Sequence, residues 1–271
     1  MRADGNRSSR RRTSACIGLN LAKGDRSVPL PRKRADLLLV ERGLFESRAR
    51  AQAAIEAGLV TANDKPVLKA SEGIAADAVV QAQPAHPFVS RGGVKLAGAL
   101  AQYPVEIENH VCLDVGASTG GFTEVLLAHG ASLVFSIDVG RGQLHPSLHG
   151  HPRIVSMEET DIRKLEGRRL PMRPDVVVID VSFISLKAVL PVALSLAAAP
   201  MHLLALIKPQ FEAPRKHSKR GIIRDATVHQ QVCDDIAALA ASLGCSEIRV
   251  FPSSIAGGDG NLEFFIGARR G

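Results

Sequence analysis

The stretch DVGASTGGF, residues Asp114–Phe122, decides the fold because it places a glycine-rich turn between a buried strand and a helix. The apolar run before Gly116 predicts the strand, and the residues after Gly120 begin the helix. Glycines let a ligand approach the backbone, and the start of a helix offers unpaired N–H groups. The stretch therefore indicates a nucleotide or nucleoside site, although a tight turn without a ligand would use the same residues.

The spacing of the glycines favours one class of ligand. A dinucleotide fingerprint needs G-x-G-x-x-G, but Ser118 stands at its middle glycine. A nucleoside without a pyrophosphate, such as S-adenosylmethionine, fits this departure better. Asp138 ends the next predicted strand, twenty-two residues after Gly116, where a carboxylate can accept hydrogen bonds from both ribose hydroxyls.

Strands alternate with helices from about Phe88 onward, which predicts an α/β domain with a doubly wound, mostly parallel, seven-stranded sheet. The last two strands are joined by the loop Gly257–Gly260 without a helix, so one strand should be antiparallel. The predicted strands are Val111–Val115, Leu133–Ile137, Ile154–Met157, Val176–Asp180, His202–Ile207, Glu247–Phe251 and Leu262–Gly267.

The uncharged run Ala188–Ile207 is twenty residues long, which is enough to span a bilayer. Pro191, Pro200 and His202 divide it, so it predicts a buried helix opened by Pro191 and then a core strand. An export signal is not expected either, because the apolar stretch after Arg12 is short and interrupted. We therefore expect a cytoplasmic protein that needs no membrane.

The chain before Phe88 predicts a small α+β domain. Two helices are expected, at Leu37–Arg42 and Arg48–Ala57, and Ser47 is a suitable N-cap for the second. A stiff connector follows at Pro84–Pro87. The predicted divisions are a basic arm at 1–33, the small domain at 34–83, a linker at 84–89 and the larger domain at 90–271.

The net charge of +7 is concentrated at the front of the chain. Residues 1–34 hold ten Lys and Arg and two Asp, and the remainder carries 24 basic and 25 acidic residues. Such an arm fits a polyanionic partner, because basic clusters gain affinity by releasing phosphate counterions. A solvated leader or an upstream start codon would give the same composition.

The four cysteines indicate neither a metal site nor a disulfide framework. Cys16, Cys112, Cys233 and Cys245 are separated by 96, 121 and 12 residues, and no C-x-x-C pair occurs. No residue pattern indicates an oligomeric state.

Several charged residues fall where chemistry is expected. Asp180 and Lys208 each follow an apolar strand, at the sheet edge where ligands bind in open parallel sheets. One such residue can simply mark where a buried strand meets water. Two opposite charges beside a nucleoside site indicate instead that these residues belong to a functional site. Asp161 either caps a short turn or accepts from an adenine amino group. Glu263 lies in an apolar predicted strand and needs a partner there.

The ordered motifs of the chain resemble those of the hemolysin A (TlyA) family, in which an S4 RNA-binding domain precedes an FtsJ-like 2'-O-ribose methyltransferase with a Rossmann-like sheet. The resemblance covers about residues 34–269. The motifs are RADLLLVERGLFESRARAQAAIEAGLV, VSRGGVKL, DVGASTGGFTEVLL, DVSFISL, KPQFE, RDATVH and GGDGNLEFF.

The resemblance implies a catalytic tetrad and an S-adenosylmethionine pocket. Two features depart from the shared pattern: the arm before Arg34, and Asp161, where the family usually has Asn. The implied catalytic residues are Lys95, Asp180, Lys208 and Glu263; the implied pocket residues are Asp114, Gly116, Gly120, Phe122, Asp138, Asp161 and Asp180.

The resemblance also implies ribosomal RNA as substrate, with cytidine in 16S rRNA, 23S rRNA or both as the methylated nucleotide. The chain has no Trp and 4% aromatic residues, so phosphate and shape contacts should outweigh base stacking. The expected RNA contacts are Arg34, Arg48, Arg50 and Arg91. Two alternative functions are considered. A non-catalytic ribosome-assembly factor would lack one or more of the four catalytic residues, and a membrane-active hemolysin would need a secretion signal.

Overall fold

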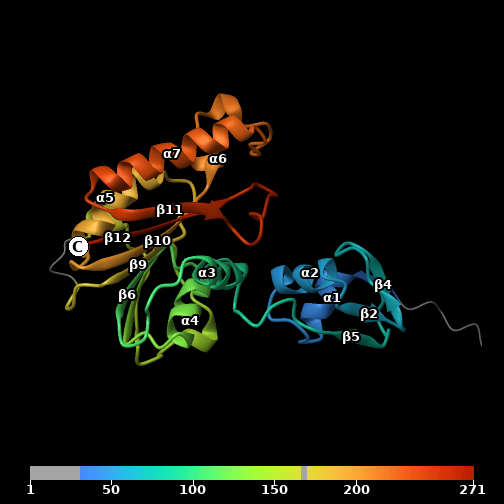
Figure 1. Ribbon diagram of the computed structural model, residues 1–271. Coiled ribbons are helices and arrows are strands. Elements are labelled where there is room, and N and C mark those ends of the chain that lie inside the picture. Colours follow the sequence, from blue (N-terminus) through green and yellow to red (C-terminus); the bar gives the residue numbers. More distant parts are fainter. Residues whose placement is uncertain (1–30, 166–169) are drawn as a thin grey trace, which may run out of the picture. The chain divides into compact units, whose positions relative to one another are not determined.

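The computed structural model describes residues 31–165 and 170–271 of the chain. It divides into two compact units, one ending at Gln83 and the other comprising Pro84–Gly271 (Figure 1). The predicted basic arm lies outside the described residues up to position 30. Each unit is described by itself.

The N-terminal unit packs two helices against short strands. Ser47 caps the second helix by accepting a hydrogen bond from the Arg50 N–H, as the sequence predicts. Leu39, Ala51, Ile55 and Val60 lie in its core, each at most 2% exposed. The elements are β1 (Arg32–Arg34), α1 (Ala35–Glu41), α2 (Arg48–Glu56), β2 (Val60–Ala62), β3 (Lys65–Pro66), β4 (Gly73–Ala75) and β5 (Val80–Ala82).

The folded unit begins earlier than the predicted boundary at Arg34. Arg32 and Lys33, assigned to the arm from their charge, form β1 and pair antiparallel with β4. The pairing satisfies backbone groups, which composition does not reveal. The four short strands β2 to β5, which follow the two helices, are not among the predicted elements.

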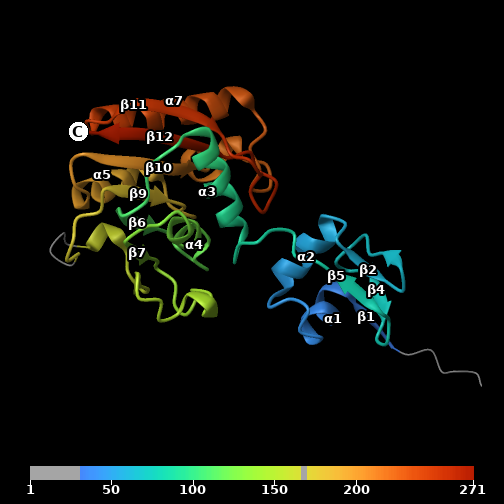
Figure 2. The ribbon, with the colours of Figure 1, turned by 60° about the horizontal axis from the view of Figure 1, so that its bottom comes forward.

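The C-terminal unit is built on the predicted seven-stranded sheet. Its strand order is β11-β12-β10-β9-β6-β7-β8, and β12 runs antiparallel to both of its neighbours, β11 and β10 (Figure 2). The strands are β6 (Val111–Val115), β7 (Leu133–Ile137), β8 (Ile154–Met157), β9 (Val176–Ile179), β10 (Met201–Ile207), β11 (Ser246–Pro252) and β12 (Phe264–Arg270).

Helices cover both faces of this sheet, because successive side chains of each strand point to opposite sides. Leu113, Val177 and Leu203 pack with α5 (Leu186–Leu196) and α7 (Ala226–Ser242). Cys112, Val176 and Leu204 pack on the other face with α3 (Arg91–Gln102) and α4 (Gly121–Ala128). Figure 1 shows α5 and α7 on one side of the strands and α3 and α4 on the other.

Two predicted elements need correction. Pro191 does not open its helix but lies inside α5, which begins earlier because Ser185 caps it. A proline in the second turn removes only one helical hydrogen bond, so α5 continues through Pro191. Glu263 is not inside a strand, because β12 begins one residue later at Phe264. No helix among the described residues is both long and apolar enough to cross a membrane.

Candidate active site

Three adjacent strands bring three of the predicted catalytic residues to one edge of the sheet. Ile179 of β9 pairs with Ala205 of β10, and Ile207 of β10 pairs with Phe264 of β12. Asp180 and Lys208 come directly after β9 and β10, and Glu263 comes directly before the antiparallel β12. All three therefore lie at the carboxyl edge of the parallel strands, where open α/β sheets bind ligands.

Lys208 and Asp180 form a close ion pair at this edge. The Lys208 Nζ lies 2.6 Å from the Asp180 Oδ1 and donates to the Ser182 Oγ at 2.9 Å. Lys208 is only 8% exposed. Removing an ammonium from water is unfavourable unless it is paired, so Asp180 and Ser182 hold the amine in one position.

Lys95 and Glu263 form a second ion pair. Lys95 is buried on the inner face of α3, and its Nζ donates to the Glu263 Oε2 at 2.6 Å. The Gln210 Nε2 reaches the other Glu263 oxygen at 3.5 Å, and Gln210 lies two residues after Lys208. The structure thus pairs the four predicted catalytic residues two by two, and the register of β10 and β12 brings the two pairs to neighbouring strand ends.

The glycine-rich turn lies beside the first pair. Gly116 has a φ of +84° and its Cα faces the backbone of Asp180, so that an added Cβ would collide with the Asp180 carbonyl oxygen. Gly120 has a φ of +89° and is the N-cap of α4. Both positions therefore require glycine, the first for close approach of two strand ends and the second for the turn into the helix.

A cavity of about 460 Å³ opens at this edge, within the size range of small-molecule sites. Of the seven predicted cofactor residues, four line it: Gly116, Asp138, Asp161 and Asp180. The Asp138 carboxylate accepts from the N–H groups of Ser118 and Gly140, at 2.8 and 2.7 Å, which fixes its orientation at the cavity wall.

The other three predicted cofactor residues do not line this cavity. Phe122 is 3% exposed and stacks on Phe265 in the core. Gly120 lies against Leu148 rather than the cavity. Asp114 is completely buried in β6. These residues shape the turn and the core behind the cavity, which a motif does not distinguish from its wall.

Asp114 is a buried carboxyl group with an unusual pKa. Burial raises its pKa to about 7, the hydrogen bond from the Thr123 hydroxyl lowers it in part, and the charge of Asp180 raises it further. Thr123 donates to the Asp114 Oδ2 at 2.6 Å and also contacts the Ser136 hydroxyl. The Asp114 Oδ1 is buried without a hydrogen-bond partner among the described residues.

Comparison with known families decides the class of this unit. The family model described as FtsJ-like methyltransferase matches residues 88–270. The chain belongs to the FtsJ-like methyltransferase family. An S4 domain model matches residues 33–80, so we call the two units the S4 unit and the methyltransferase unit.

Individual relatives match almost the whole chain. The 16S/23S rRNA (cytidine-2'-O)-methyltransferase TlyA of Mycobacterium tuberculosis is 40% identical over 243 residues, 88% of this chain and 90% of its own length. Hemolysin A of Brachyspira hyodysenteriae is 36% identical over 85% of this chain and 97% of its own. The solved structure of a protein named as a hemolysin from Streptococcus thermophilus has 38% identity, covers 89% of both chains and gives a TM-score of 0.71.

Sequence reasoning did not single out several residues of the methyltransferase site. Ser182 binds Lys208, and Arg163 forms an ion pair with Asp161 at 2.7 Å, which lowers the pKa of Asp161. Phe183 has a φ of +64°, is 91% exposed and lies 5.0 Å from the Phe211 ring, centroid to centroid. Ser182 and Phe183 belong to the motif DVSFISL, which identified the family without indicating their individual contacts.

In the S4 unit, two of the predicted RNA-binding arginines have a partner inside the protein. Asp36 is completely buried and forms ion pairs with Arg34 at 3.0 Å and Arg48 at 2.8 Å. The Gln52 amide also donates to Asp36, at 3.0 Å. Hydrogen bonds from Arg34, Gln52 and Arg48 hold the pKa of Asp36 well below its usual range. The side chains of Arg34 and Arg48 remain about half exposed.

Of the other two predicted RNA contacts, Arg91 is exposed and Arg50 is mostly buried, with 21% of its side chain exposed. Arg50 lies 3.9 Å from Glu46 in the S4 unit. Arg91 begins α3 of the methyltransferase unit and donates to the Ala256 carbonyl at 2.5 Å. Arg91 therefore belongs to the rim of the methyltransferase unit and not to the S4 unit.

Proposed function

We propose that the protein transfers a methyl group from S-adenosylmethionine to the ribose 2'-hydroxyl of a cytidine in ribosomal RNA, in the cytoplasm. The observation that carries the proposal is the buried Lys208–Asp180 pair beside the 460 Å³ cavity. The S4 domain and the activity in the name of the Mycobacterium tuberculosis relative support RNA, and specifically rRNA, as the substrate.

The cavity fits the methyl donor. Gly116 lines the cavity where its turn packs against the Asp180 backbone, and Asp138 presents a fixed carboxylate suited to ribose hydroxyls. Asp161 and Asp180 line the same cavity, and a carboxylate favours a neighbouring sulfonium. When bound, S-adenosylmethionine supplies an activated methyl group for in-line displacement.

Lys208 is the group that we assign to the acceptor hydroxyl. The hydroxyl must lose its proton during methyl transfer, so a base or an anion-stabilising group must lie within hydrogen-bond reach. A neutral Lys208 amine would take the proton, and a charged one would orient the hydroxyl and stabilise the developing oxyanion. Asp180 and Ser182 hold the amine in position in either case.

The remaining residues hold the acceptor nucleotide. Lys95 and Glu263 form a rigid pair at the neighbouring strand end, where they can position the ribose and its phosphate. The exposed ring of Phe183 offers a surface on which a splayed-out base can stack. In the S4 unit, Arg34, Arg48 and Arg50 present charge for phosphates, and Arg91 does so on the methyltransferase unit.

The proposal is tested by incubating the full chain with methyl-labelled S-adenosylmethionine and separated small and large ribosomal subunits, and then mapping the ribose-methylated positions. We expect label at a cytidine 2'-oxygen in one or both subunits. Subunits that bind the protein but take up no label would contradict the proposal and favour an assembly factor. Label on a base would contradict the assigned acceptor.

A further inference from the structure

A strongly basic segment of the methyltransferase unit takes no part in the site described above. Residues 214–224, PRKHSKRGIIR, lie between α6 (Pro209–Glu212) and α7 and carry five Lys and Arg without an Asp or Glu. Lys216, Lys219, Arg220 and Arg224 are exposed, and within the described residues none forms an ion pair or a side-chain hydrogen bond. We call this stretch the basic segment.

Both ends of the basic segment are fixed to the strand ends that carry the catalytic pairs. On one side, Glu212 accepts from the Ser185 hydroxyl and from the Leu186 N–H at 2.7 Å, which ties it to the loop that follows Asp180. On the other side, the buried Asn261 accepts from the Ile223 N–H and donates to the Gly221 carbonyl, each at 3.0 Å. Asn261 lies two residues before Glu263.

The basic segment also borders a second cavity of about 590 Å³. Ser218 of the segment lines it together with Gln210, Phe211 and Phe183. Phe183 lines the 460 Å³ cavity as well, so the two cavities are neighbours. Gln210 of the second cavity lies two residues after Lys208, so we take this cavity as the entrance for the acceptor nucleotide.

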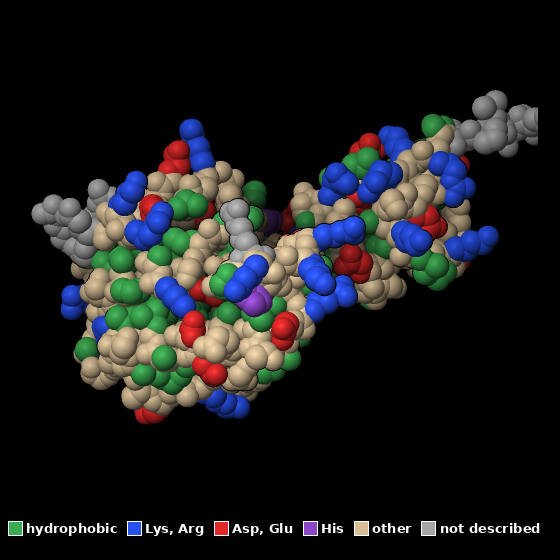
Figure 3. Space-filling model, turned by 90° about the horizontal axis from the view of Figure 1, so that it is seen from above, with side chains coloured by type: hydrophobic (Ala, Val, Ile, Leu, Met, Phe, Trp, Pro, Cys, Tyr) green, Lys and Arg blue, Asp and Glu red, His purple; other side chains and the backbone are tan. Residues whose placement is uncertain are grey.

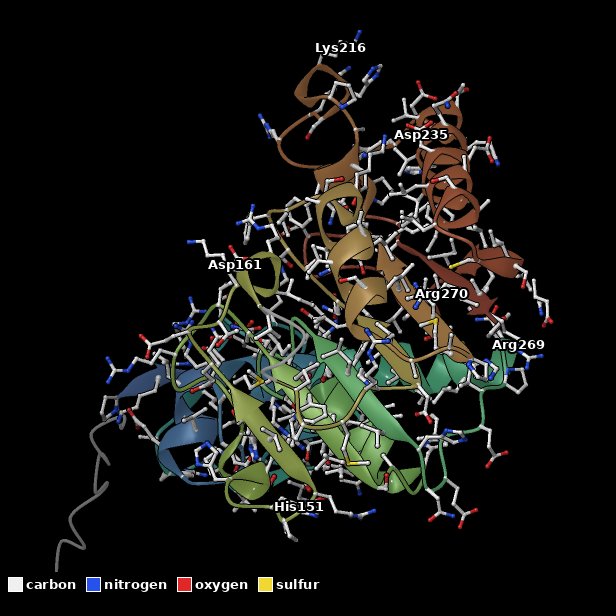
Figure 4. The ribbon with its side chains drawn as sticks, turned by 90° about the vertical axis from the view of Figure 1, so that its left-hand side faces the viewer. His151, Asp161, Lys216, Asp235, Arg269 and Arg270 are labelled. Carbon is white, nitrogen blue, oxygen red and sulfur yellow. The ribbon has the colours of Figure 1, made fainter. Side chains whose placement is uncertain are left out.

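Unpaired charges beside such an entrance have a physical consequence. A nucleotide that reaches Lys208 brings the phosphates of its neighbours with it, and lysine and arginine bind phosphates by releasing counterions. Figure 3 looks down on the part of the unit that carries α7 and shows several Lys and Arg side chains on it. Figure 4 shows Lys216 at the outer tip of the unit, far from Arg269.

We propose that Lys216, Lys219, Arg220 and Arg224 bind the backbone phosphates of the RNA strand that flanks the methylated nucleotide. This inference rests on the proposed function, since it assumes that the acceptor is RNA. The S4 unit would then dock the substrate, while the basic segment holds the strand at the reacting site.

The test compares the salt dependence of binding to ribosomal subunits for the full-length wild type and the variant Lys216→Gln/Lys219→Gln/Arg220→Gln/Arg224→Gln. We expect the slope of log affinity against log salt to fall by about 3, because each phosphate contact contributes roughly 0.7 to 0.9. The KM for subunits should rise on the order of 10-fold. The rate with saturating subunits should change by less than about twofold, because the segment acts on binding.

A matched control separates this surface from charge in general. Arg220→Gln/Arg224→Gln is compared with Arg173→Gln/Arg269→Gln, which removes two exposed arginines near the amino ends of the parallel strands. Only the first pair should lower the slope, by about 1.5. Equal slopes for both pairs, with S-adenosylmethionine binding retained, would overturn the inference. Binding slopes need no turnover, so a wild type that binds subunits but does not methylate them contradicts the proposed function alone.

Discussion

The two units each contain a cluster of buried charge, but only the cluster in the methyltransferase unit buries its cations as well as a carboxylate. In the S4 unit the Asp36 carboxylate is completely buried, and its partners Arg34 and Arg48 extend to the surface. In the methyltransferase unit the lysines themselves are buried, with Lys208 and Lys95 both 8% exposed. A buried carboxylate with exposed arginines holds those arginines at the surface, where they can contact RNA phosphates. A buried amine beside a cavity can instead contact the reacting hydroxyl of a bound substrate.

Apart from the loss of Lys208 itself, the largest effect should come from removing the charge of Asp180. Asp180→Asn weakens the hold on Lys208, so methylation of ribosomal subunits should fall by roughly 10²- to 10³-fold in single-turnover assays. The matched control is Asp235→Asn, because Asp235 forms an exposed pair with Lys187 at 2.8 Å. A similar loss in both variants would show that the buried pair has no special role.

The Lys95–Glu263 pair should show the cost of leaving a buried charge alone. Lys95→Met should destabilise the methyltransferase unit by about 3 kcal/mol, because Glu263 stays buried without its cation. The double variant Lys95→Met/Glu263→Leu should recover most of that stability. Hydrogen exchange of the full chain measures this for the methyltransferase unit; a double variant as unstable as the single one would contradict the pairing.

The stabilities of the two units should depend on pH in opposite directions. Burial raises the pKa of Asp114, whereas hydrogen bonds lower the pKa of Asp36. The unfolded chain ionises Asp114 near pH 4, whereas burial raises its pKa in the folded unit to about 7. Between these values the unfolded state binds fewer protons, so the free energy of unfolding should fall by about 1.4 kcal/mol per pH unit. Asp114→Asn should remove this slope, because an amide resembles the neutral carboxyl. An unchanged slope in that variant would exclude Asp114 as its source.

The smallest effect should come from Arg48. Arg48→Ala should lower the stability of the S4 unit by about 1 kcal/mol, since solvent screens a half-exposed partner of Asp36. Arg50→Ala, in the same helix, provides a second arginine for the RNA-binding measurement. Each variant should also lower the salt slope of RNA binding by about 1. Loss of stability in Arg48→Ala without a change in slope would restrict Arg48 to a structural role.

The sequence predicts the methyltransferase sheet well because buried strands leave local signals. The predicted bounds of β6, β7 and β8 agree with the structure, and the loop Gly257–Gly260 indicates the antiparallel β12. Apolar runs between turn residues are determined by burial on both sheet faces. The S4 strands escape prediction because they are two or three residues long, and β1 and β3 are wholly exposed.

The candidate site is predicted less completely. The motifs supply Lys95, Asp180, Lys208 and Glu263, but only the packing of α3, β9, β10 and β12 shows that Lys208 pairs with Asp180 and Lys95 with Glu263. A motif also cannot separate a cavity wall from the core behind it, as Phe122 shows. Gln52, one partner of Asp36, lies sixteen residues away along the chain, and hydrophobic periodicity does not predict such a contact.

The central claim is that the Lys208 amine acts on the acceptor hydroxyl, and its most direct test is the single-turnover methylation rate of Lys208→Met with both S-adenosylmethionine and ribosomal subunits bound. We predict a fall of roughly 10²- to 10⁴-fold with both binding affinities retained. A rate near that of the wild type under these conditions would contradict the account.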